Sequence, residues 1–219
     1  MTTKSTENVE IKPIEIVTAN VRIRGNSPLI VHKWSEKAKR QILDKQTKAP
    51  RSAAREAKNP VGDFIDSMYW MTPAPSEKSE DGFKAAVAAG ARWGFPVTAI
   101  KQATISAAYR NGLTKDMASL RGAFFIDGEG PDLLAEIKGC VPTMREDMVR
   151  VGMGTADIRF RGQFTDWYMD LTIRYNKNGQ YSLSQIVNLM NIGGFSCGIG
   201  EWRPEKDGQN GMYSVTAAI

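Results

Sequence analysis

The fold is decided by the stretch Ser182-Leu-Ser-Gln-Ile-Val-Asn-Leu-Met-Asn-Ile-Gly-Gly-Phe-Ser-Cys-Gly-Ile-Gly-Glu-Trp-Arg-Pro-Glu-Lys-Asp-Gly-Gln-Asn-Gly-Met-Tyr-Ser-Val215. Apolar residues between Leu183 and Met190 recur at i, i+3, i+4 and i+7, which predicts an amphipathic helix. Ser182 is placed to cap its first turn and Gly193 to end its last. An irregular passage with many glycines follows, and residues 212–219 predict a closing strand. The unit is therefore a helix, a glycine-rich loop and a strand.

Upstream of this unit, the sequence predicts one strand, then helices, then further strands. β-Branched residues dominate 14–24, and helical spacing of apolar residues runs through 82–109, where 82–90 predicts a core helix. The alternation from Trp167 to Tyr175 is typical of a half-buried strand, and Gly152-Met-Gly154 predicts a hairpin turn. The other strands are expected within 120–138 and 156–161. A helix is expected to begin at Asn59-Pro60 and to carry Phe64, Met68 and Met71 at helical spacing.

This order of elements is βαββαβ, the order of ferredoxin-like and RNA-recognition modules. We therefore expect an α+β fold with a ferredoxin-like (RRM-like) core and a basic insertion after the first strand. The expected organisation is a flexible N-terminal tail, 1–12, followed by a single domain, 13–219. Within that domain, 33–75 would form a thumb-like, basic insertion. One face of the sheet would lie under two helices, and Arg22, Arg24, Arg174 or Tyr168 could then occupy the other.

Positive charge is concentrated in one segment. The chain carries a formal net charge of +5, and the 26 residues from Lys33 to Lys58 hold nine basic and three acidic side chains. A localised cationic segment is the electrostatic footprint expected for a polyanionic partner, because each neutralised phosphate releases counterions. The alternative is a solvated surface loop.

Composition excludes several classes of protein. The 219 residues include 42% hydrophobic residues, enough for a sizeable core, but only two cysteines and a single histidine, His32. These counts exclude a disulfide framework and a multi-histidine zinc site. No phosphate-binding glycine motif is present. We expect no enzyme activity, no catalytic residue, no metal and no cofactor. The N-terminus has no signal-peptide pattern, so we expect a cytoplasmic protein without membrane contact, in the host cytoplasm if phage-encoded.

The chain resembles the RAMP superfamily, in particular Cas7-type backbone subunits of CRISPR effectors. The resemblance lies in the expected ferredoxin-like core, a first strand running into Gly25, the alanine-rich segment Gly82-Phe-Lys-Ala-Ala-Val-Ala-Ala-Gly-Ala-Arg92 and the glycine-rich loop after the last helix. The string Gly198-Ile-Gly-Glu-Trp-Arg-Pro204 also resembles uncharacterised bacteriophage proteins. The RAMP resemblance implies that the loop contacts guide RNA, through Gly198, Gly200, Gly208, Gly211, Arg203 and Lys206. Alternatively, the loop is a long turn around a packed Trp202.

These observations predict a non-enzymatic protein that binds single-stranded nucleic acid, RNA in preference to DNA, and oligomerises along the strand. Aromatic side chains would stack on bases and cations would grip phosphates. A structural or assembly protein of a bacteriophage is the alternative, and a metal-dependent nuclease is a more distant one. The candidate nucleic-acid-binding residues are Lys33, Trp34, Lys37, Lys39, Arg40, Lys45, Arg51, Arg55, Arg159, Arg161, Gly198, Gly200, Trp202, Arg203 and Lys206.

Overall fold

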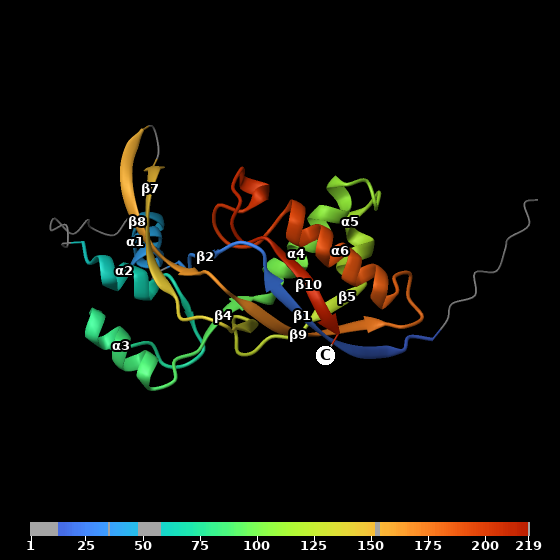
Figure 1. Cartoon of the computed structure of the whole chain (residues 1–219). Coiled ribbons are helices and arrows are strands. Elements are labelled where there is room, and N and C mark those ends of the chain that lie inside the picture. The colour runs from blue at the N-terminus through green and yellow to red at the C-terminus, as the bar shows by residue number, and fades with distance from the viewer. Residues whose placement is uncertain (1–12, 35, 48–57, 152–153, 219) are drawn as a thin grey trace, which may run out of the picture.

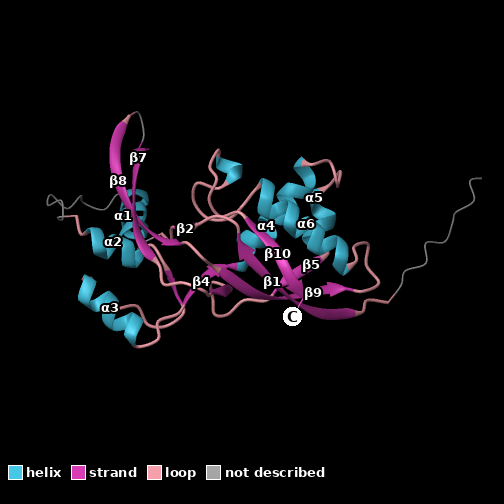
Figure 2. Cartoon of the chain, viewed as in Figure 1, coloured by secondary structure: helices cyan, strands magenta, loops and turns pink. Residues whose placement is uncertain are grey.

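The computed structural model has a mixed α+β fold and describes residues 13–34, 36–47, 58–151 and 154–218. Strands of this described part form three antiparallel sheets, with helices grouped on one side of the largest (Figures 1 and 2). The predicted tail, 1–12, lies outside the described residues. None of the helices described is long and apolar enough to cross a membrane.

The largest sheet has the strand order β10-β1-β9-β5, and every neighbouring pair in it is antiparallel. Helices α4 (Val97–Arg110) and α6 (Leu183–Ser196) pack against each other on one face of this sheet (Figure 1). Alternate side chains of the central strands point toward the helices and are buried, which confirms the two strands expected from β-branched and alternating residues. The four strands are β1 (Ile16–Gly25), β5 (Phe124–Ile126), β9 (Tyr168–Asn176) and β10 (Tyr213–Ala218).

Helix α6 begins where the sequence predicts but ends later. The hydroxyl of Ser182 accepts from the amide of Gln185, whose side chain in turn accepts from the Ser182 amide, so a capping box starts the helix. Gly193 does not end it. A Cβ at Gly193 would lie 3.0 Å from the backbone of Thr104 in α4, and one at Gly194 would lie 2.0 Å from a β10 carbonyl oxygen. Both glycines therefore serve close packing inside the helix.

Two long segments are inserted around this sheet. The first lies between β1 and α4 and contains β2 (Leu29–Val31), α1 (Glu36–Gln46), α2 (Pro60–Asp66), β3 (Tyr69–Trp70), α3 (Glu80–Ala88) and β4 (Trp93–Pro96). The second lies between β5 and β9 and contains β6 (Leu134–Ile137), β7 (Thr143–Val151) and β8 (Thr155–Phe164). They build the sheets β2-β8-β7 and β3-β4-β6. The predicted hairpin around Gly152-Met-Gly154 is confirmed as β7 and β8. The helix predicted at Asn59-Pro60 is α2, but it ends at Asp66 instead of reaching Met71, because the chain turns into β3.

Some predictions were wrong in detail. Helix α3 has no buried residue, so 82–90 is not a core helix, although Phe83 and Val87 pack against the core from outside. The strand expected from Leu120 starts only at Phe124, because Asp116 caps a short helix, α5 (Met117–Arg121), with bonds to two backbone amides. Strand β4 was not predicted.

Candidate functional site

The basic segment contains an exposed helix. Six side chains of α1 are described, those of Lys39, Arg40, Ile42, Leu43, Asp44 and Gln46, and all six are exposed. Trp34, just before the helix, is 60% exposed. We call Trp34 together with α1 the basic arm. An isolated helix of this length is only marginally stable in water. Because α1 buries none of its described side chains, its stability depends on contacts other than the packing of these side chains.

Described contacts anchor the segment at both ends. Lys33 lies 3.5 Å from a carboxylate oxygen of Asp132 and over the ring of Tyr69. Lys58 pairs with Asp157 of β8 at 2.9 Å and sits over the ring of Phe160. The segment therefore leaves the body near β3 and returns at the β7–β8 hairpin. Of the remaining candidates, Arg51 and Arg55 lie outside the described residues, as do the side chains of Lys37 and Lys45.

The hairpin places its two candidate arginines differently. Arg159 is partly exposed and pairs with Asp157 at 2.8 Å. Arg161 is buried, and its guanidinium donates to Asp147 at 3.1 Å. Burial would raise the pKa of the Asp147 carboxyl, but hydrogen bonds from Arg145 and Arg161 outweigh it and hold the pKa below its ordinary value. The prediction that Arg161 grips phosphate is therefore not supported, because its charge is already balanced inside the protein.

The face of the largest sheet opposite α4 and α6, which we call the open sheet face, carries the side chains suggested from sequence. In the register of β1 and β9, Arg24 is opposite Tyr168, Arg22 opposite Asp170 and Thr18 opposite Arg174. Directly opposed residues share one face, so Arg22, Arg24, Tyr168 and Arg174 occupy it together. The guanidinium of Arg22 lies 4.4 Å from the centre of the Tyr168 ring.

Most cations on the open sheet face are already paired. Asp170 accepts from Arg22 at 2.7 Å and from Lys138 at 3.1 Å. Arg24 pairs with Asp166 at 2.9 Å and Arg174 with Asp127 at 2.6 Å. Four cations thus face three carboxylates, and the face is close to neutral. Exposed ion pairs of this kind contribute about 0–1 kcal/mol each to stability. These cations could therefore exchange their carboxylates for other anionic partners at small cost.

The glycine-rich loop packs mainly on its own chain. Gly200 has φ +78°, and a Cβ there would lie 2.4 Å from the carbonyl oxygen of Ile30 in β2. Gly198 has φ +64° and approaches Pro204. The loop amide of Glu201 donates to the same Ile30 oxygen at 2.9 Å. The predicted close approach is therefore present, but its partner is β2, which favours the structural alternative for these two glycines.

The loop's candidate side chains also differ in availability. Arg203 donates to the Glu205 carboxylate at 2.9 and 3.1 Å and to the carbonyl oxygen of Gly200 at 3.0 Å. This guanidinium is held by the loop itself. Trp202, which would be packed in the alternative interpretation, is 40% exposed, and its side chain helps to lower the pKa of Asp147. Lys206, in a 3-10 turn (Pro204–Lys206), is exposed.

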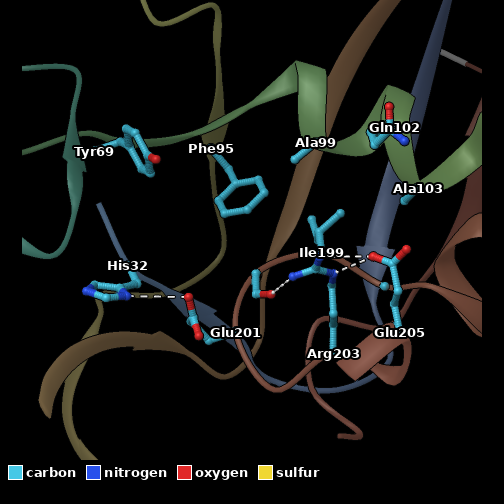
Figure 3. Close-up of a pocket in the computed structure, with 12 residues that line it drawn as sticks. His32, Tyr69, Phe95, Ala99, Gln102, Ala103, Ile199, Glu201, Arg203 and Glu205 are labelled. Atoms are coloured by element: carbon cyan, nitrogen blue, oxygen red, sulfur yellow. Dashed lines mark hydrogen bonds and ion pairs between the residues drawn. The ribbon is translucent and has the colours of Figure 1, made fainter. Parts of the chain in front are cut away.

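Sequence reasoning missed a pocket that this loop forms with α4, His32, Tyr69 of β3 and Phe95 of β4. The cavity has a volume of about 230 Å³, and Figure 3 shows Tyr69, Phe95, His32 and Glu201 around it. Nδ1 of His32 lies 3.4 Å from a carboxylate oxygen of Glu201. The neighbouring His32 lowers the pKa of Glu201, more than burial raises it. The residues that line the pocket come from segments far apart in the sequence. His32, the single histidine, was the only sequence signal that could have indicated this pocket.

Comparisons with protein families and with curated proteins find no relative. No protein-family model matches the chain, and no curated protein matches it. Within 13–34, 36–47, 58–151 and 154–218, no group of three or more His, Cys, Asp or Glu side chains is arranged to hold a metal ion.

Proposed function

We propose that the chain is a non-enzymatic protein that binds single-stranded nucleic acid, RNA in preference to DNA, and assembles along the strand in the manner of a Cas7-type backbone subunit. The observation that carries this proposal is the basic arm. It combines the exposed cations Lys39 and Arg40 with the exposed indole of Trp34, and none of its described side chains is buried. Cations that follow a backbone beside aromatic rings that stack on bases are the usual elements of single-strand binding.

We also propose that the largest sheet with α4 and α6 is a ferredoxin-like core. Strand order β10-β1-β9-β5, antiparallel throughout, with α4 between β1 and β5 and α6 between β9 and β10 in the chain, supports this interpretation. Known RNA-recognition modules of this topology stack bases on the face away from the helices. Tyr168 lies on that face in this protein, and a base could stack on the Tyr168 ring in place of the Arg22 guanidinium. A core of this kind is one part of the resemblance to the RAMP superfamily.

A second candidate function is an assembly protein of a bacteriophage particle. It is favoured by apolar side chains that are exposed in the described part of the chain. Ile42 and Leu43 on α1 are 38% and 57% exposed, and Met148 on the hairpin is 77% exposed. A protein partner would bury such side chains, whereas phosphates would not. In that case the cations of the arm would contact acidic protein surfaces.

Charge reversal in the arm tests the proposal. Binding of the wild type and of a Lys39→Glu/Arg40→Glu variant to single-stranded RNA and DNA of equal length would be measured by fluorescence anisotropy from low to moderate salt. Removing one phosphate contact to a single strand changes the slope of log K against log salt by about 0.7, so the variant should bind more weakly and show a slope reduced by about 1.4. RNA should bind more tightly than DNA.

The matched control is Lys84→Glu/Lys115→Glu, which makes the same change of charge at exposed positions outside the arm. The control should weaken binding only through net charge and keep the wild-type slope. If both double variants change the slope equally, the arm is not the binding site. If the wild type binds neither strand at any salt concentration, the proposal fails and the assembly function is favoured.

A further inference from the structure

The pocket between α4 and the glycine-rich loop, which we call the loop pocket, has room for a small planar group. Its volume of about 230 Å³ lies below the roughly 300–1,000 Å³ typical of sites for drug-sized ligands. Ala99 and Ala103, one turn apart on α4, line it with small side chains, and Phe95 and Tyr69 form an aromatic wall (Figure 3). The two rings meet edge to face at 6.3 Å. A flat ligand could stack on such a wall.

Charges in the loop pocket disfavour phosphate. Glu201 and Glu205 contribute two carboxylates, against one guanidinium, that of Arg203. Arg203 donates to Glu205 and to Gly200, and Glu205 also accepts from Arg110 at 2.8 Å. Arg203, the guanidinium of the lining, is therefore already paired and poorly placed to bind an anion. An uncharged ligand that donates hydrogen bonds suits the carboxylate of Glu201 better.

Two polar side chains in the loop pocket offer acceptors. Glu201 lies 3.4 Å from His32 and 3.7 Å from the buried guanidinium of Arg161, and neither distance is that of a close hydrogen bond. Gln102 uses its NH₂ group to donate to Ser106 at 3.0 Å, and no hydrogen bond from the described part of the chain reaches its Oε1. The pocket therefore presents oxygen acceptors beside an aromatic wall.

We infer that the loop pocket holds one nucleobase of the bound strand, turned out from its neighbours, and that it favours bases with an exocyclic amino group. This inference rests on the proposed function. A carboxylate accepts well from such an amino group, as Glu and Asp do from cytosine, whereas thymine and uracil carry none. Enzymes that flip a base read it in the same way, by stacking and by hydrogen bonds to its pairing edge. The arm would hold phosphates outside the pocket while the base enters it.

A pocket-filling variant tests the inference. Ala99→Leu places a larger side chain in the cavity and keeps α4 intact, since leucine is a good helix former. Ala85→Leu, at an exposed position of α3, is the matched control. The probes are oligo(dA), oligo(dC) and oligo(dT) of one length and a strand of that length with abasic positions, measured by anisotropy at several salt concentrations.

We expect the wild type and Ala85→Leu to bind oligo(dA) and oligo(dC) about tenfold more tightly than the abasic strand, a typical effect of one stacked base. Ala99→Leu should reduce this difference by the share of the one base held in the pocket, because Trp34 and Tyr168 would still stack on other bases. It should keep the wild-type salt slope, because the phosphate contacts remain. Glu201→Ala removes the carboxylate acceptor, so it should reduce the preference over oligo(dT) but keep stacking. Melting temperatures of all variants would show that they are folded.

The outcomes separate this inference from the proposed function. If the strands bind but Ala99→Leu keeps the full preference for oligo(dA) and oligo(dC), the pocket is not a base site and the proposed function stands. If no strand binds but adenosine or cytidine shifts the NMR signals of pocket residues in the wild type and not in Ala99→Leu, the pocket stands and the proposed function fails. If Ala99→Leu changes self-association without any strand, the pocket lies between copies and the inference is overturned.

Discussion

Replacing Gly200 by alanine tests how the glycine-rich loop is fixed on β2. A residue with a Cβ at φ +78° costs about 1–2 kcal/mol. The added Cβ would also lie 2.4 Å from the Ile30 carbonyl oxygen, a backbone atom, and overpacking of this kind costs about 1–3 kcal/mol. The free energy of unfolding should therefore fall by about 2–5 kcal/mol. For a chain of this size that corresponds to a drop in Tm of about 4–20 °C.

Two other glycines make matched controls for a thermal melt followed by circular dichroism. Gly112 has φ +69° but nothing within 4 Å of its Cβ position, so Gly112→Ala should cost only the backbone strain, about 1–2 kcal/mol. Gly122 has no positive φ and open space, so Gly122→Ala should be neutral or slightly stabilising. If Gly200→Ala melts at the same temperature as Gly112→Ala, the contact with β2 contributes nothing and the reasoning is refuted.

Two further predictions concern the buried ion pair and assembly. Asp147→Asn should lower the free energy of unfolding in urea by about 3–5 kcal/mol at pH 7, because Arg161 would keep a buried charge without its closest carboxylate. The pKa of Asp147 in the folded protein lies below its ordinary value of 3.8. The extra stability of the wild type over Asp147→Asn is therefore fully present above pH 3.8 and disappears as pH falls through the folded pKa. A stability difference that stays unchanged down to about pH 2 would contradict this. In sedimentation with single strands of increasing length, the number of proteins per strand should rise in steps, and one protein on every length would exclude assembly along the strand.

Local sequence signals predicted the elements whose own residues determine them. Strand β9 alternates between buried and solvent-facing side chains, and a helix beginning after Ser182 follows from its cap and its apolar spacing. The β7–β8 hairpin follows from strand-forming residues on either side of two glycines. In each case the residues that form the helix or strand also contain the sequence pattern that predicts it.

Tertiary contacts determined what local signals did not predict. Gly193 sits inside α6 because α4 passes too close for a side chain, and α4 is far away in sequence. Strand β4 has only four residues, including a glycine and a proline, and it exists because β3 and β6 pair with it on either side. The loop pocket joins His32, Tyr69 and Glu201 from separate segments, so no spacing in the sequence encodes it. Likewise, Arg161 could not be distinguished from an exposed arginine until its contact with Asp147 was known.

Strand pairing in the largest sheet has a consequence for synthesis on the ribosome. Gly25 at the end of β1 pairs with Tyr213 at the start of β10, so one edge of β1 has no partner until roughly 190 further residues have been made. At about 5–20 residues per second, that interval is about 10–40 s. An unpaired strand edge is a template for aggregation during this time. The nascent chain is therefore expected to need protection of β1 by a chaperone, and fast translation of the segment between the two strands should improve the yield of folded protein.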